Sequence, residues 1–146
     1  MKKQALNPSK NAHSKPYHSD HTDAASLHLQ GASGLLFIMQ SSLEPSSDGE
    51  LPERKYAALA HTIITLINHA HECLVDDQAD FGNDWANILL TLEGTQAALD
   101  ALTSGYDGQC DLPVNLIQVA TLHSLRHLTD EAVAYIDAYS SDKGAA

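Results

Sequence analysis

Apolar residues recur at the spacing of one helical face in four segments of this chain, and no segment alternates as a half-buried strand does. In the first segment, Leu29, Leu36 and Leu43 share such a face. Prolines and an Asp-Gly turn separate the first segment from the second and the third from the fourth. The pattern predicts an all-α fold, a four-helix bundle, with helices over residues 23–43, 52–75, 84–103 and 113–139.

The two halves of the chain share an order of motifs that is typical of an internal duplication. Each half has a helix, an Asp-Gly turn, a Leu-Pro pair and a second helix. If the duplication is real, residues 22–76 and 83–140 form similar hairpins, and Gly31 and Gly94 allow a close crossing of the first and third helices. Chance is the alternative, because Asp-Gly turns and prolines at helix starts are common.

The ends of the chain lack the periodicity of the middle. Residues 1–21 hold two prolines and many polar residues, so we expect a flexible N-terminal tail, with Asp20 or Thr22 capping the first helix. A second short tail is expected over residues 141–146. The remaining residues, 22–140, are enough for one helical domain with a hydrophobic core.

The charge of the chain is unevenly distributed. The formal net charge is −11 at pH 7, and four of the eight lysines and arginines lie before residue 16. From residue 24 onward there are 17 acidic residues and four cations. Such a body repels nucleic acid and anionic membranes and attracts a basic protein surface. We therefore expect no direct nucleic-acid binding by the body, no membrane association and a basic protein partner.

The cysteines and the N-terminus indicate a reduced, cytoplasmic protein. Cys73 and Cys110 have neither metal-binding nor redox spacing, and the first residues contain no apolar run that could act as a signal peptide. No stretch reaches the roughly 18 apolar residues that a membrane span needs. No cofactor motif is present in the sequence, so we expect no cofactor.

An acidic cluster at the junction of the two predicted hairpins is the candidate partner-binding site. It consists of Glu72, Asp76, Asp77, Asp80 and Asp84. Like charges at this density repel one another, so either solubility or a basic partner explains them. The hypothesis is a docking site for a basic surface, and the alternative is a solvated junction.

Histidines offer an alternative metal site. His123, His127 and Glu131 follow one another at four-residue spacing, which places their side chains on one helical face. They fall on the polar side of the predicted helix, away from Leu125 and Leu128. Exposed histidines on a solvated face are therefore the competing interpretation.

Other chemistry is poorly supported. The segment from Asp76 to Asn87 lacks both the glycine position and the final Glu of a calcium loop. There is no nucleophile elbow or phosphate-binding glycine loop, and the carboxylates are scattered. We therefore predict no catalytic residues and no enzyme activity.

Together these features predict a non-catalytic interaction module that binds and inhibits or regulates a partner with a basic surface, such as a nucleic-acid-binding protein. One concrete form is an anti-defence inhibitor encoded by a mobile element. Apolar runs at residues 35–39 and 114–120 suggest a homodimer. The alternatives are a metal- or small-ligand-binding bundle that uses His123 and His127, and a nucleic-acid-binding regulator that uses the lysine-bearing tail.

Overall fold

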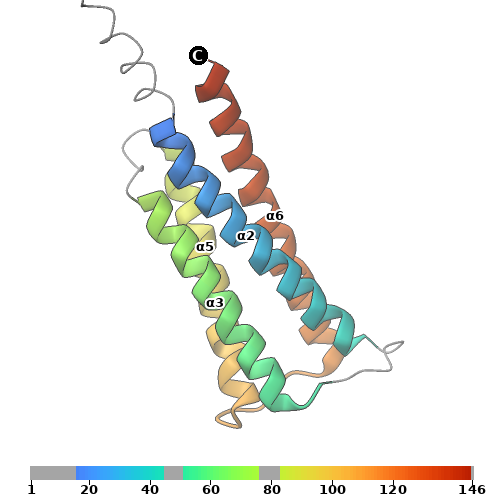
Figure 1. Cartoon of the computed structure of the whole chain (residues 1–146). Coiled ribbons are helices and arrows are strands. Elements are labelled where there is room, and N and C mark those ends of the chain that lie inside the picture. Colours follow the sequence, from blue (N-terminus) through green and yellow to red (C-terminus); the bar gives the residue numbers. More distant parts are fainter. Residues whose placement is uncertain (1–15, 45–50, 76–82, 146) are drawn as a thin grey trace, which may run out of the picture.

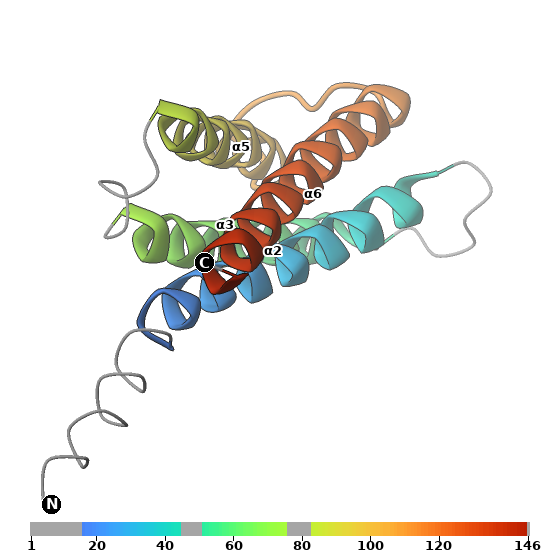
Figure 2. The ribbon, with the colours of Figure 1, turned by 90° about the horizontal axis from the view of Figure 1, so that it is seen from above.

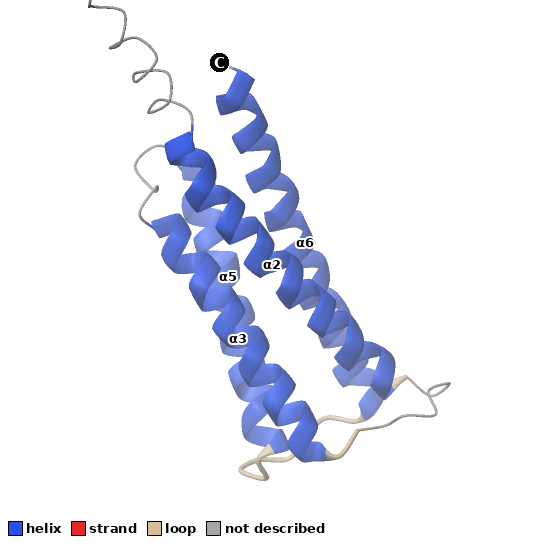
Figure 3. Ribbon diagram, in the orientation of Figure 1, coloured by secondary structure: helices blue, strands red, loops and turns tan. Residues whose placement is uncertain are grey.

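Four long helices make up the part of the chain that the structure describes. The computed structural model describes residues 16–44, 51–75 and 83–145, with side chains for residues 21–44, 51–75 and 86–139. Within these ranges every element is helical and no strand occurs, as Figures 1 and 3 show. The helices are α2 (Pro16–Leu43), α3 (Glu53–Val75), α5 (Asn83–Tyr106) and α6 (Asn115–Ala145).

The helices run alternately down and up and form an open bundle (Figures 1 and 2). α2 lies against both α3 and α6, and α3 also packs on α5. α5 and α6 hardly touch each other, although they are consecutive. The all-α four-helix bundle is therefore confirmed, but one of its sides, between α5 and α6, is not closed by helix packing.

The outer ends of the bundle differ from the sequence prediction. α2 begins at Pro16, so the expected start near residue 23 was wrong, and Thr22 is a buried residue inside the helix instead of its cap. Proline suits the first turn of a helix because its missing N–H has no partner there in any case. α6 continues to Ala145, beyond the expected end at residue 139. Residues 1–15 of the predicted tail lie outside the described residues.

The predicted crossing of the first and third helices at two glycines was also wrong. A Cβ on Gly31 would lie 3.5 Å from Cδ1 of Leu66, which belongs to α3, the second predicted helix. A Cβ on Gly94 would meet nothing within 4 Å. The two hairpins also differ, since α2 packs closely on α3 whereas α5 barely contacts α6. Sequence periodicity defines which face of a helix is apolar but not which helix covers it.

The core is built from aliphatic side chains, most of them at positions where periodicity predicted an apolar face. Its largest completely buried apolar residues are Leu29, Leu36, Met39, Ile63, Ile67, Leu74, Leu92, Leu99, Leu122 and Ile136. Leu122 is completely buried although it was not among the predicted positions, and Ile117, which was, is 52% exposed. Leu128 is also an exception, because it was expected on the apolar face of its helix and is 38% exposed. No described helix is long and apolar enough to cross a lipid bilayer.

Serine–aspartate hydrogen bonds join α2 to α6. The Ser26 hydroxyl donates to Oδ1 of Asp137 at 2.8 Å, and the Ser33 hydroxyl donates to Oδ1 of Asp130 at 2.5 Å. Ser26 and Ser33 are buried and lie seven residues apart, as do the two aspartates. Hydrogen bonds to ionised acceptors are stronger than neutral ones, so these pairs fix the register of two antiparallel helices.

A network of aromatic and amide groups closes the end of the bundle where α5 turns into α6. The rings of Tyr56 and Tyr106 are stacked with centroids 5.4 Å apart. The Tyr106 hydroxyl donates to Oε1 of Gln118 at 2.9 Å, and Nε2 of Gln118 donates to the Pro113 carbonyl at 2.8 Å. Tyr106 and Gln118 are both almost completely buried. The network therefore connects α3, α5 and α6 at this end.

α5 ends in a Schellman motif. Gly108 has a φ of 78°, a left-handed conformation that favours glycine. The Gly108 amide donates to the Gly105 carbonyl at 3.0 Å, and the Gln109 amide donates to the Ser104 carbonyl at 2.8 Å. These bonds satisfy carbonyls that the helix end leaves without partners. The Asp-Gly pair recognised in the sequence therefore ends the helix by this mechanism.

Candidate functional site

The structure describes only part of the predicted acidic cluster. Glu72 is exposed on α3 and accepts a hydrogen bond at 3.2 Å from Nδ2 of Asn68. Asp84 lies at the start of α5, and its side chain is outside the described residues. Asp76, Asp77 and Asp80 also lie outside them. The docking role of the cluster therefore stays a prediction.

A second acidic surface, of which sequence reasoning found only Glu72, follows the junction of α3 and α5. Glu93 and Asp100 are exposed on α5, Asp107 is exposed just after its end, and each lies seven residues from the next. With Glu72 they form what we call the acidic seam. The seven-residue spacing was the signal in the sequence, because it keeps side chains on nearly the same helical face.

Polar contacts hold part of the acidic seam in place. Nε2 of His71 on α3 lies 3.0 Å from Oε1 of Glu93 on α5. Nε2 of Gln96 donates to Oδ1 of Asn68 at 3.4 Å, and Asn68 in turn donates to Glu72. The carboxylates of Glu72 and Glu93 are thus linked to neighbouring helices while remaining exposed to solvent.

Lysine and arginine are absent from the whole central part of the chain. None occurs in the sequence between Lys55 and Arg126, so α5 carries no cationic residue of either type. Arg126 lies on α6, where its guanidinium stands 4.7 Å from the centre of the Phe37 ring. Local lysines or arginines therefore do not neutralise the α5 part of the acidic seam.

A hollow with both polar and apolar lining lies beside the acidic seam. It has a volume of about 240 Å³ and is lined by His71, Val75, Ala86, Leu89, Leu90 and Glu93. Leu90 is 66% exposed and Val75 is 41% exposed. Large apolar side chains beside carboxylates give a surface both the charge and the desolvation energy that binding a protein needs.

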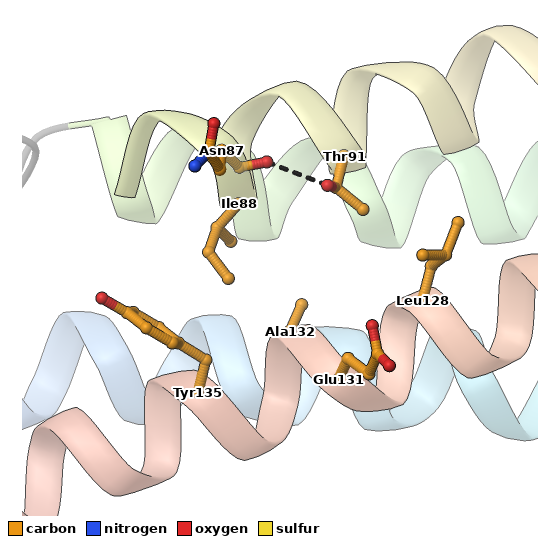
Figure 4. Close-up of a pocket in the computed structure, with 7 residues that line it drawn as sticks. All are labelled: Asn87, Ile88, Thr91, Leu128, Glu131, Ala132 and Tyr135. Carbon is orange, nitrogen blue, oxygen red and sulfur yellow. Dashed lines mark hydrogen bonds between the residues drawn. The ribbon is translucent and has the colours of Figure 1, made fainter. Parts of the chain in front are cut away.

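A second hollow separates α5 from α6 (Figure 4). This groove has a volume of about 310 Å³. Its lining residues are Asn87, Ile88 and Thr91 on α5 and Leu128, Glu131, Ala132 and Tyr135 on α6. The groove lies on the side of the bundle that helix packing leaves open, and it contains Glu131 of the predicted alternative site.

The predicted histidine site is an exposed row on α6. His123 and His127 are exposed, and Nε2 of His127 lies 3.2 Å from Oε1 of Glu131. Within the described part of the chain, no three His, Cys, Asp or Glu side chains come together as metal ligands would. The exposed, polar position that the helical wheel predicted for these histidines is therefore confirmed. Among the described residues, no third side chain joins His127 and Glu131 as a metal ligand.

The two apolar runs are divided between core and surface. Leu36 and Met39 are completely buried, whereas Phe37 and Ile38 are each 50% exposed. In the second run, Val114, Leu116 and Ile117 are all more than half exposed. These exposed side chains are the ones available for self-association.

Tyr106 has a raised pKa, and its position in the fold is structural. Burial, and secondarily the neighbouring Tyr56, raise the pKa of Tyr106 from 10.0 to about 12. The neutral hydroxyl is thus favoured, and it is engaged with Gln118 in the closed end of the bundle. Tyr106 belongs to neither of the two hollows.

The chain was compared with protein-family models, with curated proteins and with solved structures, and none of the three comparisons found a match. The functional argument therefore depends on the chemistry of the residues themselves.

Proposed function

We propose that this chain is a non-catalytic interaction module that binds a protein with a basic surface, and inhibits or regulates it by occupying that surface. The observation that carries the proposal is the acidic seam, whose exposed carboxylates are accompanied on α5 by no lysine or arginine. An uncompensated surface of one sign attracts a surface of the opposite sign and raises the rate of encounter.

The apolar side chains in the lining of the hollow beside the seam supply desolvation energy that charge alone does not. Exposed ion pairs contribute little to affinity, because both partners remain hydrated. Binding energy is concentrated in residues that become desolvated at the centre of an interface. Leu90 and Val75 offer such a centre next to Glu93, so the proposed partner surface has an apolar side chain flanked by lysines or arginines.

A basic surface that normally holds nucleic acid fits this description. An acidic protein that covers it blocks nucleic acid by competition, without any catalytic step. The concrete form that we favour is a cytoplasmic inhibitor, encoded by a mobile element, that acts on a nucleic-acid-handling defence complex of the host. In this proposal the exposed apolar residues of α2 and α6, such as Phe37 and Leu116, are the candidate surface for a homodimer.

The test compares two variants of equal charge. The seam variant carries Glu72→Gln, Glu93→Gln and Asp100→Asn. Its control carries Asp23→Asn, Glu53→Gln and Glu131→Gln, three exposed carboxylates elsewhere on the bundle. Proteins captured from native host lysate by the wild type are identified, purified and titrated with each variant.

We expect the seam variant to bind the partner about tenfold more weakly, since three charge pairs of about 0.5 kcal/mol each are lost. The control variant should stay within about threefold of the wild type, and nucleic acid should compete with the wild type for the partner. Equal weakening by both variants would show that only net charge matters. A partner that binds the seam variant as tightly as the wild type would refute the proposed site.

A further inference from the structure

The groove between α5 and α6 exists because each of these helices is held by a different neighbour. α5 packs on α3, and α6 packs on α2. Where the two helices face each other across the groove, small side chains occupy central positions, namely Thr91 on α5 and Ala132 on α6. The space is therefore a consequence of the bundle's packing order and not of one missing side chain.

The walls of the groove are mainly apolar. Figure 4 shows Ile88 projecting from α5, and Ala132 and Leu128 projecting from α6, into the gap. The ring of Tyr135 lines one end. Leu128 is 38% exposed although it belongs to a helix face predicted to be buried, so this side chain lacks the cover that a closed bundle would provide.

The polar groups of the groove favour a cation. Glu131 is the only acidic or basic residue in the lining, and its side chain is 63% exposed. The Thr91 hydroxyl donates its hydrogen to the Asn87 carbonyl at 2.9 Å, so toward a ligand this oxygen can act only as an acceptor. An aromatic ring such as that of Tyr135 also attracts cations to its face.

We infer that this groove is a binding site for a small organic cation, a molecule with an aromatic or aliphatic body and an ammonium group. Its apolar body lies between Ile88, Leu128 and Ala132, and its ammonium group lies against the Glu131 carboxylate. A volume of about 310 Å³ is at the lower end of the range of roughly 300–1,000 Å³ that is typical of small-molecule sites. This site is separate from the acidic seam, so the inference does not depend on the proposed function.

Other occupants fit the groove less well. A metal ion would need more ligands than Glu131 and the adjacent His127, because zinc sites have three or four protein ligands. An anion would meet the Glu131 carboxylate and the strongly negative field of the chain.

The probes that test the inference differ in a single group. Tryptamine has an indole ring with an ammonium group, and indole-3-propionate has the same ring with a carboxylate. Each is titrated into the full-length, ¹⁵N-labelled protein in 0.15 M NaCl, and the amide resonances are followed by NMR. The variants are Glu131→Gln, Thr91→Phe to fill the groove, and Asp100→Asn as a control with the same charge change on the acidic seam. Circular dichroism and melting temperature establish that each variant is folded.

We expect tryptamine to cause saturable shifts in residues 87–91 and 128–135, and indole-3-propionate to bind at least about tenfold more weakly. Glu131→Gln should weaken tryptamine binding by about threefold to fivefold, the effect of one exposed ion pair. Thr91→Phe should abolish the shifts, and Asp100→Asn should leave the dissociation constant unchanged within error. Equal binding of both probes, an equal effect of Glu131→Gln and Asp100→Asn, or no saturation by 10 mM tryptamine would overturn the inference.

Discussion

Replacing Tyr106 with phenylalanine tests whether the closed end of the bundle depends on its buried hydrogen bonds. The substitution removes only the hydroxyl, which donates to Oε1 of Gln118 at 2.9 Å. Gln118 is 3% exposed, so water cannot readily replace the lost donor. Leaving a buried polar group without its partner costs about 1–3 kcal/mol. We expect Tyr106→Phe to lower the free energy of unfolding by about 2 kcal/mol.

Urea denaturation followed by circular dichroism measures this change. With a slope of about 2 kcal/mol per molar urea, the midpoint should fall by about 1 M. Gln118→Met provides the second branch of a double-mutant cycle, because it removes the acceptor and keeps a side chain of similar length. In that background Tyr106→Phe should cost almost nothing, since no acceptor is left unpaired. If Tyr106→Phe costs the same in both backgrounds, or less than about 0.5 kcal/mol in the wild type, the hydrogen bond does not stabilise the fold as argued.

Three further predictions concern the pKa of Tyr106 and two glycines of α5. Because burial raises the pKa of Tyr106 to about 12, its neutral form contributes stability that is fully present below pH 10 and is lost between pH 10 and 12. Denaturation of the wild type and Tyr106→Phe across this range should give a steeper decline for the wild type, and parallel curves would contradict the shifted pKa. Gly94→Ala should raise the free energy of unfolding by about 0.5–1 kcal/mol, because its Cβ meets nothing within 4 Å and alanine favours a helix. Gly105→Ala should lower it by about 1–3 kcal/mol, because its Cβ would lie 2.7 Å from Cγ of Leu112 and closer still to Cδ2. Equal melting temperatures for the two alanine variants would show that Leu112 moves aside at little cost.

The sequence predicted the helices better than their arrangement. Leu29, Leu36, Ile63 and Ile67 are completely buried, as their periodicity indicated, because the apolar face of a helix is a local property of the chain. The early start of α2 was missed, because no apolar periodicity marks the residues that follow Pro16.

The neighbours of each helix could not be predicted from spacing alone. Ser26 and Ser33 looked like ordinary polar residues of the first helix, and their acceptors, Asp137 and Asp130, lie on the last helix. Such long-range pairs depend on which faces meet during folding. They join α6 to α2, and a helix α6 held there leaves the groove beside α5, for which the sequence has no pattern.

The acidic seam was only partly visible in the sequence. The acidic residues between Glu72 and Asp84 are close together in the sequence and were therefore predicted as a cluster. Glu93 and Asp100 are seven residues apart and share one face only when the helix is folded. The contact between His71 and Glu93 adds a second helix to this surface. A search for acidic residues at seven-residue spacing would have found the α5 part.

The lack of lysine and arginine between Lys55 and Arg126 also determines which enzymes can act on the chain. Acetyltransferases and ubiquitin ligases that modify lysine side chains find no target on α5 or on most of α3. Trypsin, which cleaves after lysine and arginine, leaves residues 56–126 as one peptide even when the protein is fully unfolded. The central helices are thus beyond the reach of lysine modification and of tryptic processing, and any enzyme that acts on them must do so through other residues.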